Sequence, residues 1–412
     1  MRTRWSTSRI ACACSASVSS TRSGIAAFRI GTSPRSTNAS RSPIAPAVKL
    51  VPERGEPTTK TRRSSSGPRS RVLVPRTATR TAVEPYADAA QAACLTTCTN
   101  PTSCTPGLLQ VRKVSRVKLS HADRVLFPDD GVTKGDLFDY YGRVADVLVP
   151  HLRDRPFTLK RYPHGITGEV YFQKQVPRGA PEWIPTREFT THPREGGSRQ
   201  VDFALVNSRD AVLWMVQMNC VDMNAWYSRV DKAGRPDFVV FDLDPPDEPN
   251  GYELAIEVAQ LIRGLLDEVE LPGYVKTSGA DGIHVLAPIQ RRADFDDTYA
   301  FAEAASRLLE QRHPGLVTTE WLKKKRTGVL VDHRQNGWGK TIASVYSVRP
   351  KPGAPVSTPL RWDELTKDVR PRDYGMEVVL ERVARHGDLF APVLEDARPL
   401  GAAAKKLTRL VP

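Results

Sequence analysis

Residues 238–246, with the sequence FVVFDLDPP, join an apolar run to two closely spaced aspartates. β-branched and aromatic residues favour a buried strand, and proline is poorly tolerated inside one, so a strand that ends before the proline pair is expected. Side chains two residues apart in a strand point to the same face, so Asp242 and Asp244 would project together. Because neighbouring carboxylates repel each other unless a proton or a cation lies between them, the pair favours a hard divalent ion. A plain surface end of a strand is the alternative interpretation.

The remaining patterns mix helices and strands without regular βαβ alternation. Thr133 is expected to cap a helix that Pro150 ends, because Asp136 follows the cap by three residues and apolar residues then recur at helical spacing. Further helices are predicted at 254–266, 295–311 and 375–386, and strands at 157–161, 170–172, 204–206, 238–243, 274–277, 283–286, 328–332 and 341–346. Residues 209–217 fit either structure. These patterns predict an α+β (mixed α/β) domain over residues 111–400 and a short C-terminal tail at 401–412.

Residues 1–110 have a different composition from the rest of the chain. They hold 16 of the 60 Lys and Arg residues but only 4 of the 46 Asp and Glu residues, and they are rich in Ser, Thr and Pro. This composition cannot bury a core, so a disordered segment is predicted. It could be a basic tail that holds DNA, a targeting peptide or an over-extended gene start, and the abrupt change near residue 111 favours the last. Because the remaining residues are nearly neutral, nucleic-acid binding there must be argued from local patches.

Cysteine usage and hydropathy exclude several classes of protein. Of the 6 cysteines, only Cys220 lies beyond residue 110, so the body has no disulfide framework and suits a reducing compartment. The cysteines at 94, 98 and 104 have neither a nearby histidine nor zinc spacing, so no zinc site is expected. No apolar run approaches the ~20 residues of a membrane span, and no secretory signal is recognisable.

A glycine-rich stretch follows the aspartate pair, at residues 277–284 with the sequence TSGADGIH. Gly279 and Gly282 permit close backbone approach, and Ser278 and free backbone N–H groups could bind phosphate oxygens. His284 opens the next predicted strand, where it could donate to a phosphate. The plainer alternative is a hairpin turn with a structural histidine.

A third stretch, residues 329–336 with the sequence VLVDHRQN, is another apolar strand that ends in a carboxylate, Asp332. Three carboxylates at the ends of neighbouring strands can hold two metal ions roughly 3.5–4 Å apart. One ion would lower the pKa of an attacking 3′-hydroxyl, and both would stabilise in-line phosphoryl transfer. Asp332 alone could be an isolated strand-end acid, so the coincidence of all three stretches is what predicts a site.

The order FDLDP, TSGxxGxH, VDxxQN and TIAxVYSVR resembles the polymerase domain of bacterial DNA ligase D, in the archaeo-eukaryotic primase superfamily. The resemblance covers residues 117–395 and implies a catalytic core of central mixed sheets flanked by helices. It implies addition of NTP or dNTP to a DNA 3′-hydroxyl with Mn²⁺ or Mg²⁺, filling gaps and extending ends in non-homologous end joining. The implied partners are DNA ends and gaps with a 5′-phosphate, Ku and a separate ATP-dependent ligase. A cytoplasmic, nucleoid-associated protein with no membrane partner is expected.

The resemblance also implies roles for individual residues, carried over by position. The metal-binding and catalytic carboxylates are Asp242, Asp244 and Asp332. The nucleotide-binding residues are Ser278, Gly279, Gly282, His284, Arg349 and Asn224. The residues for the 5′-phosphate of the downstream DNA strand are Arg124 and Lys134. The aromatic pair that stacks on template bases is Tyr171 and Phe172, although their alternation along a strand predicts that at least one lies in the core.

The chain departs from the commoner family pattern at two positions. Asp281 stands where a basic residue is frequent, and Asn224 stands where a histidine is frequent, which puts nucleotide affinity in question. The Lys-x-Asp-Gly pattern of the ligase nucleophile is absent from this sequence, so a stand-alone polymerase is expected. Two alternatives stay open: a catalytically weak DNA-end-binding module that bridges breaks for Ku and a ligase, and a metal-dependent phosphodiesterase that uses the same carboxylates.

Overall fold

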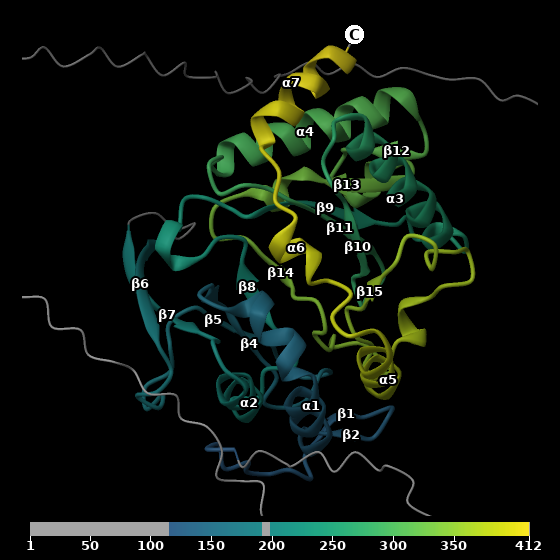
Figure 1. The fold of residues 1–412 in the computed structure, drawn as a ribbon. Helices are drawn as coiled ribbons and strands as arrows, with labels where there is room; N and C mark the ends of the chain where they lie inside the picture. The colour runs from purple at the N-terminus through teal and green to yellow at the C-terminus, as the bar shows by residue number, and fades with distance from the viewer. Residues whose placement is uncertain (1–114, 192–197, 412) are drawn as a thin grey trace, which may run out of the picture. The chain divides into compact units, whose positions relative to one another are not determined.

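The structure is a computed structural model that describes residues 115–191 and 198–411, so the prediction for residues 1–110 lies outside the described part. Its helices are α1 (Lys134–Leu152), α2 (Arg209–Gln217), α3 (Gly251–Glu268), α4 (Phe295–Arg312), α5 (Met376–His386), α6 (Pro392–Glu395) and α7 (Leu400–Leu410). Its strands are β1 (Val125–Phe127), β2 (Val132–Thr133), β3 (Pro156–Phe157), β4 (Leu159–Arg161), β5 (Tyr171–Gln173), β6 (Thr186–Thr191), β7 (Arg199–Leu205), β8 (Asn224–Trp226), β9 (Phe238–Asp244), β10 (Tyr274–Thr277), β11 (Ile283–Pro288), β12 (Val317–Thr318), β13 (Val329–Asp332), β14 (Thr341–Ala343) and β15 (Pro359–Leu360). The predicted α+β class is confirmed (Figure 1). In these ranges no helix is both long and apolar enough to cross a membrane.

A six-stranded sheet, in the order β12-β13-β9-β11-β10-β15, contains the aspartate strand β9. Every neighbouring pair is antiparallel except β12 and β13 (Figure 1). The alternate β9 residues Val239, Phe241 and Leu243 are buried in one core with the apolar faces of α3 and α4. Because alternate side chains in a strand point to opposite faces, Asp242 and Asp244 project away from that core.

A second sheet, in the order β14-β8-β3-β7-β6, packs with α1 and α2 around a second core. Val240 of β9 belongs to this second core, so the first half of β9 is buried on both faces. The predicted cap of α1 is present: the Thr133 side chain accepts from the backbone N–H of Asp136, and the Asp136 carboxylate accepts from that of Thr133 at 2.8 Å. The ambiguous residues 209–217 form helix α2, which Ser208 caps.

Several segments differ from the predicted pattern. The strand predicted at 157–161 is divided into β3 and β4, which belong to different sheets. Pro150 lies inside α1, which continues to Leu152, because a proline in the last turn removes only one backbone hydrogen bond. The strand predicted at 341–346 ends at Ala343. The segment expected as a tail forms helix α7, in which Leu400, Ala403 and Leu407 are buried in the same core as α4. These residues repeat at helical spacing, so they line one face of α7.

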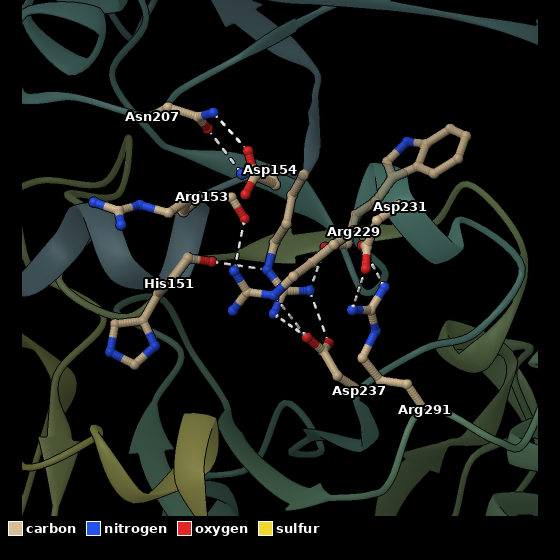
Figure 2. A network of polar contacts seen from close by, with 10 residues as sticks. His151, Arg153, Asp154, Asn207, Arg229, Asp231, Asp237 and Arg291 are labelled. Carbon is tan, nitrogen blue, oxygen red and sulfur yellow. Dashed lines mark hydrogen bonds and ion pairs between the residues drawn. The ribbon is translucent and has the colours of Figure 1, made fainter. Parts of the chain in front are cut away.

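A buried ion-pair network holds the start of β9 against the end of α1. The guanidinium of Arg155, 2% exposed, donates to both carboxylate oxygens of Asp237 at 2.8 and 2.7 Å. It also donates to the backbone carbonyls of His151 and Trp226. Figure 2 shows the carboxylate of Asp237 with Arg229 beside it. The network therefore sets the position at which β9 enters its sheet.

Candidate active site

The three predicted metal-binding carboxylates meet on one face of the six-stranded sheet. β9 lies between β13 and β11, and Asp242 is directly opposite Asp332 on one side and His284 on the other. Residues directly opposite each other in an antiparallel sheet point to the same face. Asp244, two residues along β9, points the same way. Segments separated by up to 90 residues of sequence thus place their acids on one face of this sheet.

Burial and mutual repulsion make the aspartate pair costly to ionise. Burial raises the pKa of Asp242 to about 6, although Lys276 and Arg349 oppose that rise. Burial, followed by the charge of Asp242, raises the pKa of Asp244 to about 6. The nearest cation to Asp244 is the guanidinium of Arg326, at 3.9 Å. A pair with these properties gains from any added positive charge.

A buried chain of polar contacts runs from Asp242 to Lys276. His284 approaches the Oδ1 atom of Asp242 through Nε2 at 3.2 Å and the Nζ atom of Lys276 through Nδ1 at 2.6 Å. Lys276 also donates to the carbonyl of Ala343 at 3.0 Å and to the hydroxyl of Ser357 at 2.7 Å. In its ammonium form Lys276 satisfies three acceptors, which leaves the ring hydrogen of His284 on Nε2, facing Asp242. Burial lowers the pKa of both Lys276 and His284.

The glycine-rich loop packs tightly against the end of β9. A Cβ atom at Gly282 would lie 2.2 Å from the carbonyl oxygen of Leu243, and one at Gly279 would lie 2.7 Å from Arg349. Gly279 also has a φ of +69°, which disfavours other residues. The expectation of free backbone N–H groups needs correction, because those of Ala280 and Gly282 donate to the Ser278 hydroxyl oxygen at 3.0 Å. The loop is thus closed on itself, and Ser278 can offer its hydroxyl hydrogen to a ligand.

Gly282→Ala is expected to destabilise the domain by about 1–3 kcal/mol, because the new Cβ would press on a backbone carbonyl that cannot rotate away. Thermal unfolding measures the change. Gly234→Ala is the matched control, since a Cβ there meets nothing within 4 Å. Equal melting temperatures for the two variants would show that the loop is looser than the structure indicates.

A cavity of about 330 Å³ lies over the aspartate face. It is lined by most of the predicted site residues, namely Asp242, Asp244, Ser278, Gly282, His284, Arg349, Asn224 and Phe172. Asp332 is not among the residues that line this cavity, and its carboxylate accepts from the backbone N–H of Arg334 at 3.0 Å. In the described ranges, no three His, Cys, Asp or Glu side chains are already grouped as metal ligands.

Several polar residues at this site were not predicted from the sequence, among them Lys276 and Asp222. Lys276 was assigned only to a strand, although a lysine inside an apolar strand before a glycine-rich loop is a signal that could have found it. Asp222 also lines the cavity, and one of its carboxylate oxygens accepts from Lys160 at 3.2 Å. Its other oxygen, Oδ1, is buried without a hydrogen-bond partner among the described residues.

The aromatic pair is more exposed than predicted. Tyr171 is 45% exposed and Phe172 is 71% exposed, so neither belongs to the core. The expectation failed because β5, among the described residues, pairs only with β4 in a two-stranded ribbon and keeps its aromatic side chains exposed. Phe172 lines the cavity, with the ammonium of Lys160 at 5.7 Å from its ring centroid, whereas Tyr171 donates to Glu169 outside it.

The two residues predicted to bind a 5′-phosphate lie together but away from the cavity lining. The backbone N–H of Lys134 donates to the carbonyl of Arg124 at 2.8 Å. The Nζ atom of Lys134 donates to the Ser120 carbonyl and to both oxygens of Gln217, and burial lowers the pKa of Lys134 to about 8. Arg124 donates to the carbonyl of Pro163. A phosphate would have to replace some of these protein contacts.

Comparison with known proteins identifies the family. The family model described as the LigD primase-polymerase domain matches residues 133–390, which include the aspartate strand, the glycine-rich loop and Asp332. The chain belongs to the LigD primase-polymerase family. Within this family it is similar to the multifunctional non-homologous end joining protein LigD of Mycolicibacterium smegmatis, with 34% identity over 290 residues. That match covers 70% of this chain and 37% of the relative.

Two further members of the LigD primase-polymerase family extend the comparison. The multifunctional non-homologous end joining DNA repair protein LigD of Mycobacterium tuberculosis is 35% identical over 303 residues, which cover 71% of this chain and 38% of that protein. The solved polymerase domain of M. tuberculosis Ligase D in complex with DNA matches with 33% identity and a TM-score of 0.62. That match covers 69% of this chain and 100% of the solved chain. The chain therefore spans less than two fifths of the length of these curated relatives but a whole polymerase domain.

Proposed function

We propose that this LigD-type domain adds nucleotides to the 3′-hydroxyl of DNA in the repair of broken ends, releasing pyrophosphate. The observation that carries the proposal is the meeting of Asp242, Asp244 and Asp332 on one sheet face, beside a cavity that Arg349 and Ser278 line. The relatives' names assign them to non-homologous end joining, and the solved relative is a complex with DNA. These names support DNA as the substrate and break repair as the setting.

The acid face fits a hard divalent cation, for which we propose Mn²⁺ or Mg²⁺. Its donors are carboxylate oxygens, and burial raises the pKa of Asp242 and Asp244, so a bound cation would favour their ionised forms. Asp242, Asp244 and Asp332 would hold a two-metal site, with Asp332 exchanging its contact to the Arg334 backbone for the metal. Bound ions would supply a lowered pKa for the attacking hydroxyl and neutralise charge on the phosphates.

The remaining cavity residues would bind and orient the substrates. Arg349, at the loop that Gly279 closes, would attract the triphosphate of an NTP or dNTP, and Ser278 would donate its hydroxyl hydrogen to it. Asn224 can donate to the same phosphates, and Gly282 keeps the loop close to β9. Asp281 does not add net negative charge there, because Lys351 pairs with it at 2.8 Å. His284 would keep Asp242 oriented rather than contact the nucleotide itself.

The proposal extends to the wider DNA substrate and to partner proteins. Phe172 would stack on a template base, with Lys160 nearby to attract the backbone. Arg124 and Lys134 remain the proposed contacts to a downstream 5′-phosphate. Ku and a separate ligase are the partners that end joining would require.

Primer extension on a gapped, 5′-phosphorylated duplex tests the function. The purified protein should incorporate labelled NTP or dNTP with Mn²⁺ or Mg²⁺ and stop when EDTA is added. DNA binding without incorporation would instead support the catalytically weak end-bridging module. Release of mononucleotides in the absence of triphosphate would support a phosphodiesterase.

Metal binding is expected to weaken as the pH falls through 6. The raised pKa values of Asp242 and Asp244 mean that protons compete with the metal below about pH 6. Apparent Mn²⁺ affinity should therefore fall by up to about tenfold per pH unit for each proton displaced, which calorimetry at pH 5, 6 and 7.5 measures. The same raised pKa values predict that the metal-free protein loses stability as the pH rises from about 4 through 6, because the unfolded chain then ionises two acids that the folded protein keeps protonated. A pH-independent Mn²⁺ affinity would contradict the assignment.

Phe172→Ala is expected to weaken binding to primer–template DNA by about 1–3 kcal/mol, roughly 5- to 150-fold, without lowering the melting temperature. The ring is 71% exposed, so its removal leaves no hole in a core. Fluorescence anisotropy with labelled DNA measures the loss. Val378→Ala, another exposed apolar residue but on α5, is the control and should bind as the unchanged protein does.

A further inference from the structure

A cationic hollow lies at the opposite end of β9 from the aspartates. It has a volume of about 500 Å³, and its charged lining consists of Arg229, Lys232, Arg291, Arg292 and a single carboxylate, Asp237. β9 separates Asp237 from Asp244 by roughly 20–25 Å, given its rise of about 3.3 Å per residue. The hollow is therefore distinct from the candidate active site.

The one carboxylate in this lining is already committed elsewhere. Both oxygens of Asp237 accept from the buried Arg155, and Arg229 reaches the same group only at 3.3 Å. Figure 2 shows Arg229 between Asp237 and the carbonyl of Arg153. Burial, followed by the charge of Arg155, lowers the pKa of Arg229. The carboxylate of Asp237 therefore balances only part of the positive charge of Arg229.

The other cations also have unused hydrogen-bonding capacity. Arg291 pairs with Asp231 through both terminal nitrogens, at 2.9 and 2.6 Å, but its Nε atom is buried without a partner in the described ranges. The side chains of Lys232 and Arg292 form no hydrogen bond or ion pair with any described residue. Several like charges held in one hollow repel each other, and a bound anion relieves that repulsion.

We propose that this hollow is a second binding site, specific for phosphoryl groups. Guanidinium groups match phosphate oxygens with paired hydrogen bonds, and a lysine adds a mobile positive charge. No aromatic side chain is among the lining residues, which include Ile289, Val393 and Leu394, so the site has no platform for stacking a base. The ligand class is therefore a phosphodiester backbone or a free pyrophosphate, which present the same oxygens. If the source is DNA, the hollow holds a strand away from the polymerase cavity.

Lys232→Ala combined with Arg292→Ala tests the site. Neither side chain takes part in the Arg155–Asp237 network, so the double variant should fold. Lys367→Ala with Arg385→Ala is the matched control, because it removes the same charge from exposed positions outside the hollow. Pyrophosphate and a short single-stranded thymidine oligonucleotide are titrated separately in EDTA by calorimetry. Hydrogen exchange of residues 229–232 and 289–292 then locates the bound ligand.

The unchanged protein and the control should bind at least one of the two probes and protect both backbone segments. The Lys232→Ala/Arg292→Ala variant should lose that protection and bind the probe at least about tenfold more weakly. For the oligonucleotide, the slope of log affinity against log salt should fall by about one for each phosphate that the variant no longer neutralises. Binding of the oligonucleotide alone assigns the site to a strand, and binding of pyrophosphate assigns it to the free anion. Failure of both probes to protect these segments, or equal losses in variant and control, would overturn the proposal.

Discussion

Asp242→Asn is expected to reduce nucleotide addition by at least ~10³-fold while the protein melts at the same or a higher temperature. The amide keeps the shape of the carboxylate but removes the charge that would hold a metal, and metal-assisted charge stabilisation contributes several kcal/mol to such a reaction. Stability should not fall, because burial already raises the pKa of Asp242 and makes its charged form costly. Loss of activity with retained or increased stability separates a functional acid from a structural one.

The measurements are single-turnover primer extension and thermal unfolding, both at pH 7.5. Asp247→Asn is the control, because Asp247 lies in the exposed segment after the proline pair and pairs with Lys323. It should retain the activity of the unchanged protein. If Asp242→Asn extends the primer at a rate within tenfold of that of the unchanged protein, the assignment of Asp242 as a metal-binding carboxylate is wrong, and the proposed metal site is wrong with it.

Arg155→Met is expected to destabilise the domain by about 3–5 kcal/mol, the usual cost of breaking a buried ion pair by removing one partner. Arg155 is 2% exposed and provides two of the bonds to Asp237, which lies directly before β9. Its loss also removes a donor from the carbonyls of His151 and Trp226. Urea denaturation measures the change in the free energy of unfolding.

Arg153→Met is the matched control for this prediction, because Arg153 is an exposed residue of the same connection between α1 and β3. It should change stability by no more than about 0.5 kcal/mol. Arg155→Met combined with Asp237→Asn should recover part of the loss, since the double variant also removes the negative charge that Arg155 would have balanced. Equal effects of the two single variants would show that the network contributes little.

The local features of the fold were predictable because they depend on neighbours in sequence. One example is the helix cap formed by Thr133 and Asp136. Others are the apolar face of α1 and the alternation of side chains between the two faces of β9, which follow from the fixed periods of helices and strands. The role of the glycines in the 277–284 loop was predictable for the same reason, since a close approach between backbone segments leaves no room for larger side chains. Elements with weak local signals, such as the three-residue β8 and helix α7, were missed.

The sequence by itself determined which acids could act, but only the tertiary structure decided which groups face them. The order β13-β9-β11-β10 does not follow the chain, and it places Asp332, His284 and Lys276 in one row with Asp242. Packing likewise exposed Phe172. Local periodicity sets the face on which a side chain lies, whereas strand order and coverage by other layers arise from burial of the whole chain, which no single stretch encodes.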